Sequence, residues 1–149
     1  MKHPGQLFDL GGRVALVAGG GGYLGRDICD HLAAHGADVI VADCDGAAAE
    51  AVCEAVKRRD NRARIRAEVL DVAEASSIDA VMANVGRWSD GLDVVVNAVA
   101  FSRGEPLEEV SVDDWGAGLH VSLSGAMLLS RAAARLMLAR GGGSIVNLV

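Results

Sequence analysis

A run of glycines between a short apolar segment and a helix-like pattern is the feature of this sequence that most constrains its fold. Residues 14–18 are consecutive apolar residues followed by glycine, which is the length and setting of a buried strand. Gly19 to Gly22 come next, and residues without a Cβ let the backbone turn sharply and approach a pyrophosphate closely. The spacings Gly20-x-Gly22-x-x-Gly25 and Gly19-x-x-Gly22-x-x-Gly25 both fit the dinucleotide-binding fingerprint, in which helix N–H groups face the anion. We therefore predict a dinucleotide site, for which a plain flexible turn is the alternative.

A second strand with an acidic end supports this prediction. Residues 37–43 are strand-like and end at Asp43, where a carboxylate bonds the adenosine ribose hydroxyls and repels a 2′-phosphate. No Lys or Arg follows before Lys57, so the sequence predicts NAD rather than NADP, although Arg26 lies in the first helical turn within reach of a phosphate. Asp43 could instead cap the next helix, but Asp45 is better placed for that role.

Composition limits the class of protein and its partners. The chain has 149 residues, 51% of them hydrophobic and 23% charged, which fits one globular domain over residues 1–149. Its net charge of -6 argues against nucleic acid and anionic membrane surfaces as partners. No apolar run reaches the length of a membrane span, and residues 1–6 lack the apolar core of a secretion signal. We therefore expect a cytoplasmic protein with no membrane partner.

Cysteines and histidines indicate neither a disulfide framework nor a metal site. The three cysteines are odd in number and lack CxxC spacing, as expected of reduced thiols in the cytoplasm. Asp27, His31 and His35 share one face of the first predicted helix, but a solvated face explains them better than a metal does. We predict no metal.

The rest of the chain alternates helix and strand patterns. The first helix is predicted to end near Gly36, with Leu24, Ile28 and Leu32 on one face. Further helices are expected at 47–59, around 78–85, and from a capping box at Ser111 and Asp114 to about Arg140; further strands are expected at 64–69, 93–96 and 144–149. The strand at 64–69 has one polar face, which is typical of a sheet edge.

This alternation predicts an α/β fold, a Rossmann-like doubly wound parallel sheet of about five strands. Ligands bind such sheets at the carboxyl ends of the strands, and Asp43, Asp71 and Asn97 each fall at a strand end. Two alternatives stay open. Asp71 could cap the following helix, and Asn97 could simply form a turn.

In order along the chain, these segments resemble the short-chain dehydrogenase/reductase family. The resemblance is carried by the glycine turn, Asp43, residues 70–72, residues 93–98, Trp115 with its helix, and residues 141–148, so it covers essentially the whole chain. It implies a nicotinamide cofactor, NAD or less readily NADP, and hydride transfer to or from an alcohol or ketone. The resemblance implies that Gly19, Gly22 and Gly25 bind the pyrophosphate, Asp43 the ribose, Asp71 and Val72 the adenine, and Asn97 the region near the nicotinamide ribose. Tyr23, Leu24 and Ala98, which lie beside these residues, complete the predicted cofactor-binding set.

The chain departs from the family pattern at several positions. Ala18 replaces the usual Thr before the glycines, and residues 97–100 keep the first Asn of Asn-Asn-Ala-Gly but lose the second Asn and the Gly. Ser122 stands at the position of the family's catalytic Asn and cannot reproduce an amide's geometry. The family's catalytic Ser would fall just past Val149, and the sole Tyr, Tyr23, has no Lys three or four residues after it.

The 149 residues thus resemble the cofactor-binding part of an oxidoreductase, truncated at the fifth strand, without the catalytic part and inactive alone. An unpaired apolar edge at residues 145–149 favours this interpretation. A non-catalytic dinucleotide-binding or interaction module is the alternative. A methyltransferase-like domain that holds a nucleoside cofactor is a third, but it leaves the later segments unexplained. The apolar long helix, with Met127 and Met137, suits the core or subunit packing in a homo-oligomer.

Overall fold

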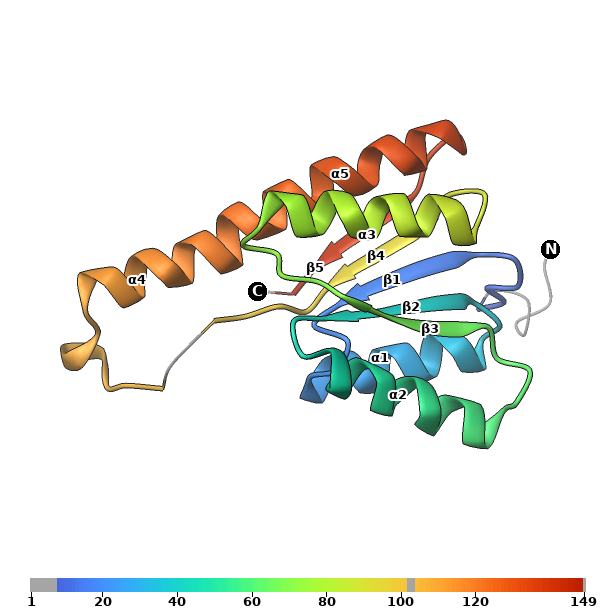
Figure 1. The fold of residues 1–149 in the computed structure, drawn as a ribbon, viewed down its shortest axis with the longest axis horizontal. Coiled ribbons are helices and arrows are strands. Elements are labelled where there is room, and N and C mark those ends of the chain that lie inside the picture. Colours follow the sequence, from blue (N-terminus) through green and yellow to red (C-terminus); the bar gives the residue numbers. More distant parts are fainter. Residues whose placement is uncertain (1–7, 102–103, 149) are drawn as a thin grey trace.

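A parallel sheet between two layers of helices forms the centre of the computed structural model, which describes residues 8–101 and 104–148 (Figure 1). The strand order is β3-β2-β1-β4-β5, all parallel. The strands are β1 (Val14–Ala18), β2 (Asp38–Asp43), β3 (Ile65–Val69), β4 (Val94–Asn97) and β5 (Ser144–Asn147). The predicted Rossmann-like α/β fold is therefore confirmed. Residues 1–7, which include the segment tested above for a secretion signal, and Val149 of the predicted fifth strand lie outside the described residues.

Helices cover both faces of this sheet. They are α1 (Tyr23–Ala34), α2 (Gly46–Arg59), α3 (Ala75–Trp88), the short 3-10 turn η2 (Leu107–Glu109), α4 (Val112–Leu119), the π-helical segment η3 (His120–Gly125) and α5 (Ala126–Ala139). Helices α1 and α2 pack on one face, α3 and α5 on the other, and α4 extends beyond the carboxyl edge of the sheet (Figure 1).

The central strand explains why the chain adopts this arrangement. All of β1 is buried, and it pairs with β2 on one side and β4 on the other. Because neighbouring residues point to opposite faces, Leu16 packs with Ile40 and Ile78 under α3 and α5. Val17 packs with Val39 and Cys29 under α1 and α2. A continuous apolar run is what a strand covered on both faces requires.

The polar strand β3 lies at one side of the sheet, as its alternating pattern predicts. Its residues Arg66 and Glu68 are half-buried, and Glu68 accepts a hydrogen bond from Asn84 of α3 at 2.7 Å. Just before β3, the Arg64 guanidinium lies 4.4 Å from the centre of the Trp88 ring. Charged side chains therefore cover this edge in place of a further strand.

The orientation of α1 differs from the prediction. Leu24 is 59% exposed, Ile28 and Leu32 are half-buried, and the residues that face the sheet are Gly25 and Cys29. The glycine turn sets this rotation, because a Cβ on Gly25 would overlap the carbonyl oxygen of Gly19. The closest approach of the helix to the sheet thus occurs at the residue without a side chain, and the apolar spacing alone does not reveal it.

The long helix begins as predicted, and then differs in its middle. Ser111 Oγ accepts a hydrogen bond from Asp114 N–H at 3.0 Å and donates one to the Asp114 carboxylate at 2.6 Å. The π-helical segment η3 interrupts the α-helix, and no sequence pattern indicated it. It ends at Gly125, where a Cβ would lie 2.9 Å from Val72 Cγ2, so this close crossing requires a glycine.

The helix of residues 112–139 is long and apolar enough to cross a membrane, judged by length and composition alone. The expectation that no apolar run reaches this length is therefore wrong. A helix that packs into a protein core passes the same test, and α5 buries Leu129, Ala132, Ala133 and Met137.

Asp93 fixes the amino end of β1. Its carboxylate accepts hydrogen bonds from Val14 N–H and from the Arg13 guanidinium, both at 2.9 Å, with Arg140 at 3.7 Å. Burial by itself would raise the pKa of Asp93, but the Val14 N–H, the Arg13 hydrogen bond and the charges of Arg140 and Arg13 together hold this pKa below its ordinary value.

We expect Asp93→Asn to lower the free energy of unfolding at neutral pH by about 2 kcal/mol, because Val14 and Arg13 lose a charged acceptor. The pKa of Asp93 is lower in the folded chain than in the unfolded chain. The ionised carboxylate therefore adds to the free energy of unfolding at pH values above the ordinary pKa, and this contribution is lost as pH falls through the folded-state pKa. Urea unfolding across acidic pH should therefore show a smaller pH dependence in Asp93→Asn than in wild type. Asp90→Asn, at an exposed neighbouring position, is the control and should behave as wild type. If Asp93→Asn lost as much unfolding free energy at acidic pH as wild type does, this account would be contradicted.

Candidate functional site

The glycine turn lies at the carboxyl edge of the sheet, between β1 and α1 (Figure 1). Gly19 has a φ of 74°, which L side chains rarely adopt, and a Cβ there would lie 2.9 Å from the Ala98 carbonyl oxygen. The turn is held by a hydrogen bond from Gly20 N–H to Ala42 O at 3.0 Å and one from Gly22 N–H to Gly19 O at 3.1 Å. No side chain caps α1 at Gly22, so its first N–H groups stay open to an anion.

Asp43 connects the end of β2 to this turn. Its Oδ2 accepts a hydrogen bond from Gly21 N–H at 2.9 Å, and its Oδ1 accepts one from Asp45 N–H at 3.0 Å. Asp45 caps α2 by accepting from Ala47 N–H and Ala48 N–H, as the sequence predicted. Asp43 is therefore free of the helix-capping role and holds its carboxylate against the glycines.

A cavity of about 430 Å³ opens at this edge, and we call it the glycine-turn cavity. Six of the predicted cofactor residues line it: Gly19, Gly22, Asp43, Asp71, Val72 and Ala98. Residues that the sequence did not single out also line it: Cys44, Leu70, Ala73, Val99, Ala100, Phe101 and Val121. Most of these are direct neighbours of the predicted residues at the strand ends, so position alone could have found them.

Four predicted residues lie outside the lining of this cavity. Gly25 is buried beneath the turn, and Tyr23 and Leu24 are exposed at the start of α1, 75% and 59% respectively. Asn97 is buried: its Oδ1 accepts a hydrogen bond from Val99 N–H, and its Nδ2 donates one to Asn147 Oδ1, both at 3.2 Å. Asn97 thus shapes the turn after β4 and ties β4 to β5, which is the turn-forming role left open above.

Asp71 forms a local turn. Its Oδ1 accepts a hydrogen bond from Ala73 N–H at 2.9 Å, and its own N–H donates to Ser77 Oγ at 3.0 Å. The residue at the start of α3 is Glu74, whose side chain makes no capping bond. The helix-capping alternative for Asp71 is therefore wrong, and its exposed carboxylate faces the glycine-turn cavity.

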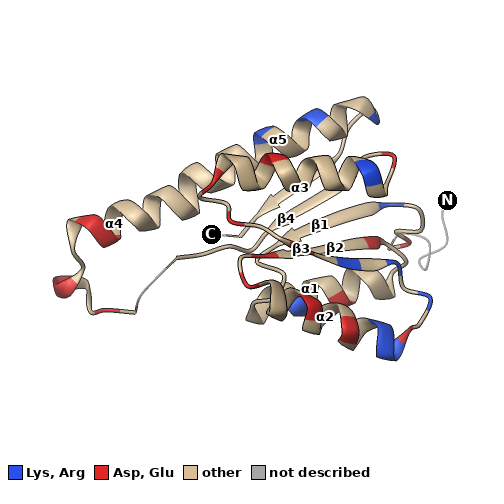
Figure 2. Ribbon diagram, in the orientation of Figure 1, with Lys and Arg blue, Asp and Glu red and all other residues tan. Residues whose placement is uncertain are grey.

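Arg26 does not line this cavity. Its guanidinium lies 4.9 Å from the centre of the Tyr23 ring and 3.9 Å from the Asp27 carboxylate. It lines a separate groove between α1 and α2 that also contains Gly21 and Ala48. Acidic residues gather around the carboxyl edge and α4, whereas most basic residues lie toward the opposite end of the sheet (Figure 2).

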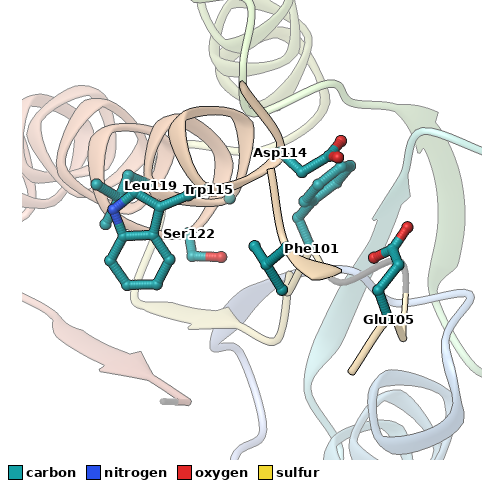
Figure 3. Close-up of a pocket in the computed structure, with 8 residues that line it drawn as sticks. Phe101, Glu105, Asp114, Trp115, Leu119 and Ser122 are labelled. Atoms are coloured by element: carbon teal, nitrogen blue, oxygen red, sulfur yellow. The ribbon is translucent and has the colours of Figure 1, made fainter. Parts of the chain in front are cut away.

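Ser122 lies in η3 and lines a second cavity of about 330 Å³, which we call the Trp115 cavity (Figure 3). Phe101, Glu105, Val110, Asp114, Trp115, Gly118 and Leu119 complete its described lining. Ser122 therefore stands one residue from the glycine-turn cavity, which Val121 lines, and does not itself enter that cavity.

The three cysteines are unpaired and differ in exposure. Burial raises the pKa of Cys29 to about 12 and that of Cys53 to about 11, so both thiols are protonated at neutral pH. Cys44 is exposed beside Asp43 in the glycine-turn cavity. Within residues 8–101 and 104–148, no group of three His, Cys, Asp or Glu side chains could hold a metal.

The family model for short chain dehydrogenases matches residues 13–149. The chain belongs to this family. The short-chain dehydrogenase chain is 38% identical, over 95% of its length, to D-threitol dehydrogenase of Mycolicibacterium smegmatis, and 31% identical, over 93%, to galactitol 2-dehydrogenase of Agrobacterium fabrum. It covers 54% and 53% of these two proteins, and so spans about half the length of such relatives.

A solved structure agrees with this short-chain dehydrogenase assignment. Gluconate 5-dehydrogenase of Burkholderia cenocepacia, in complex with NADP and tartrate, superposes with a TM-score of 0.85 at 32% identity. The match covers 97% of the present chain and 56% of that protein. The predicted family resemblance is therefore confirmed over nearly the whole chain.

Proposed function

We propose that residues 1–149 form the cofactor-binding part of a nicotinamide-dependent oxidoreductase that interconverts an alcohol and a ketone. The observation that carries this proposal is the Asp43 carboxylate held 2.9 Å from Gly21 N–H, beside a glycine turn at the carboxyl edge of the sheet. In a doubly wound fold this edge is where a dinucleotide binds. Family membership supports the same conclusion.

The turn leaves room for a dinucleotide because the glycines that line the cavity, Gly19 and Gly22, have no side chain to occupy it. A Cβ on Gly22 would meet Gly19 O at 3.2 Å, and the space above the turn opens into the 430 Å³ cavity. In our proposal the α1 N-terminus binds the pyrophosphate, Asp43 accepts hydrogen bonds from the ribose hydroxyls, and Asp71 and Val72 lie against the adenine. When bound, the cofactor supplies the hydride chemistry, and the chain orients it.

We further propose that NAD is preferred over NADP. The Asp43 charge would repel a 2′-phosphate, and no Lys or Arg is among the described residues that line the glycine-turn cavity. Arg26, the basic residue that favoured NADP, lies over the Tyr23 ring and lines another groove, which supports the preference for NAD. The related gluconate 5-dehydrogenase was solved with NADP, so the family fold itself does not decide this preference.

The reaction of the whole protein would be of the kind named for its relatives, which include dehydrogenases of threitol and galactitol. We propose that the 149 residues alone are inactive. Their one tyrosine, Tyr23, is exposed at the start of α1 and lines neither the glycine-turn cavity nor the Trp115 cavity, so it lacks the reach a general acid or base needs. NADH formation by the purified chain would contradict this. A non-catalytic dinucleotide-binding module remains the second candidate, favoured by the same observation.

Two proposals concern the protein's surroundings. The three unpaired cysteines support a reducing, cytoplasmic location. Exposed apolar side chains on the long helix outside the Trp115 cavity, namely Val112, Leu123 and Met127, support a homo-oligomer.

Protection of Cys44 tests whether the cofactor binds at the proposed place. A maleimide should label Cys44 and leave Cys29 and Cys53 unmodified in the folded chain, because those two are buried. Saturating NAD should slow Cys44 labelling by about tenfold or more, because Cys44 lines the cavity in which we propose that NAD is buried. Mass spectrometry of the labelled peptides measures both rates, and Cys44→Ser is the control that should show no label. Unchanged labelling of Cys44 by a chain saturated with NAD would contradict the proposed site.

A further inference from the structure

The Trp115 cavity adjoins the glycine-turn cavity. Phe101 lines both, and the adjacent residues Val121 and Ser122 line one cavity each. At about 330 Å³ the Trp115 cavity has the size of a small-molecule site, at the lower end of the range of about 300–1,000 Å³. A reactant must lie next to the cofactor, and this cavity adjoins the one in which we propose that the cofactor binds.

We propose that the Trp115 cavity binds the reacting molecule and that this molecule is an uncharged polyol. The inference rests on the function proposed above and specifies its substrate class. It depends on the chemistry of the cavity wall, which combines apolar surface, hydroxyl-bonding groups and negative charge.

The side chains that line the cavity offer both apolar surface and polar groups. Trp115 is 62% exposed as a residue. Its ring and the Glu105 carboxylate lie at opposite sides of the space, and the Ser122 hydroxyl points into it (Figure 3). Apolar side chains such as Leu119 suit the carbon chain of a polyol. A carboxylate accepts hydrogen bonds from hydroxyl groups, and a serine hydroxyl both donates and accepts them.

Glu105 is open to a ligand. Within the described part of the chain its carboxylate makes no hydrogen bond or ion pair, and the residue is exposed. Asp114 differs, because Ser111 Oγ already donates to its carboxylate at 2.6 Å. Glu105 is therefore the lining carboxylate whose acceptor positions a ligand hydroxyl can use.

Charge selects among polyhydroxylated compounds. Glu105 gives the cavity a negative charge, and neither Lys nor Arg is among its described lining residues. A carboxylate or phosphate on the ligand would be repelled by the like charge of Glu105. An uncharged polyol such as threitol or galactitol fits this cavity, whereas a sugar acid such as gluconate does not.

Fluorescence of Trp115 tests this inference on the chain itself. The chain has two tryptophans, so Trp88→Phe leaves Trp115 as the one reporter. With NAD at saturation, we expect threitol and galactitol to change the Trp115 emission saturably. Gluconate should bind at least about tenfold more weakly, because the Glu105 carboxylate repels the carboxylate of gluconate. Equal or tighter binding of gluconate would overturn the proposal.

Two substitutions sharpen the test in the same Trp88→Phe background. Glu105→Gln should weaken polyol binding about threefold to tenfold, the effect of one hydrogen bond, and should reduce the discrimination against gluconate. Glu109→Gln is the control, because Glu109 is exposed on the neighbouring η2 and does not line the cavity. It should change neither the polyol affinity nor the discrimination against gluconate. Polyol binding that Glu105→Gln leaves unchanged would also overturn the proposal.

The dissociation constant for NAD, measured separately by calorimetry, distinguishes failure of the proposed Trp115 site from failure of the proposed cofactor-binding function. A chain that binds NAD and no polyol contradicts the Trp115 site and leaves the proposed function in place. A chain that binds threitol at Trp115 but no dinucleotide supports the Trp115 site and contradicts the proposed function.

Discussion

Gly25→Ala is expected to destabilise the chain by about 3 kcal/mol and to abolish measurable NAD binding. The added Cβ would overlap the Gly19 carbonyl oxygen and crowd the Gly20 Cα, and both are backbone atoms that no side-chain rotation can move away. Relief requires α1 to shift away from the sheet, which would open the turn that positions its N–H groups. Urea unfolding measures the stability, and calorimetry measures the NAD affinity.

Gly86→Ala is the matched control for this substitution. Gly86 is an exposed helical glycine in α3, and a Cβ there would have nothing within 4 Å. It should stabilise the chain by about 0.5–1 kcal/mol, because alanine favours a helix over glycine, and leave NAD binding unchanged. If Gly25→Ala were as stable as wild type and bound NAD with the same affinity, then close packing at Gly25 would not be what positions α1 and its N–H groups.

Asp43→Asn is expected to weaken NAD binding by about tenfold to a hundredfold, the effect of losing a charged hydrogen-bond acceptor. NADP binding should become tighter, because the substitution removes the charge that repels a 2′-phosphate. The ratio of the two affinities should therefore fall toward unity. Calorimetric titration with both dinucleotides gives this ratio directly.

The amide of Asp43→Asn keeps the size of the side chain and still offers one oxygen to Gly21 N–H or Asp45 N–H. Stability should consequently fall by only about 1 kcal/mol, so the binding effect is measured on a folded chain. Asp79→Asn, on the exposed surface of α3, is the control and should leave both affinities unchanged. An unaltered affinity ratio in Asp43→Asn would refute the role assigned to this carboxylate.

Features that depend on local chemistry could be predicted from the sequence. The strand at residues 14–18 is an unbroken apolar run because both of its faces are covered, and Asp45 caps α2 because its side chain can reach the N–H groups of the two following helical residues, Ala47 and Ala48. The edge position of β3 follows from its polar alternation.

Features set by packing between distant segments could not be predicted in this way. The rotation of α1 depends on contact between Gly25 and the Gly19 carbonyl, so Leu24 lies outward despite its apolar spacing. The π-helical segment η3 ends at Gly125, which packs closely against Val72, a residue far away in the sequence. Asn97 was placed correctly at a strand end, but its bonds to Val99 and Asn147 depend on the neighbouring strand.

Calorimetric titration of the unmodified chain with NAD, NADP and S-adenosylmethionine tests the central claim most directly. We expect NAD to bind most tightly, NADP about tenfold or more weakly because Asp43 repels its 2′-phosphate, and S-adenosylmethionine more weakly than NAD. Tighter binding of S-adenosylmethionine than of either dinucleotide would contradict the account.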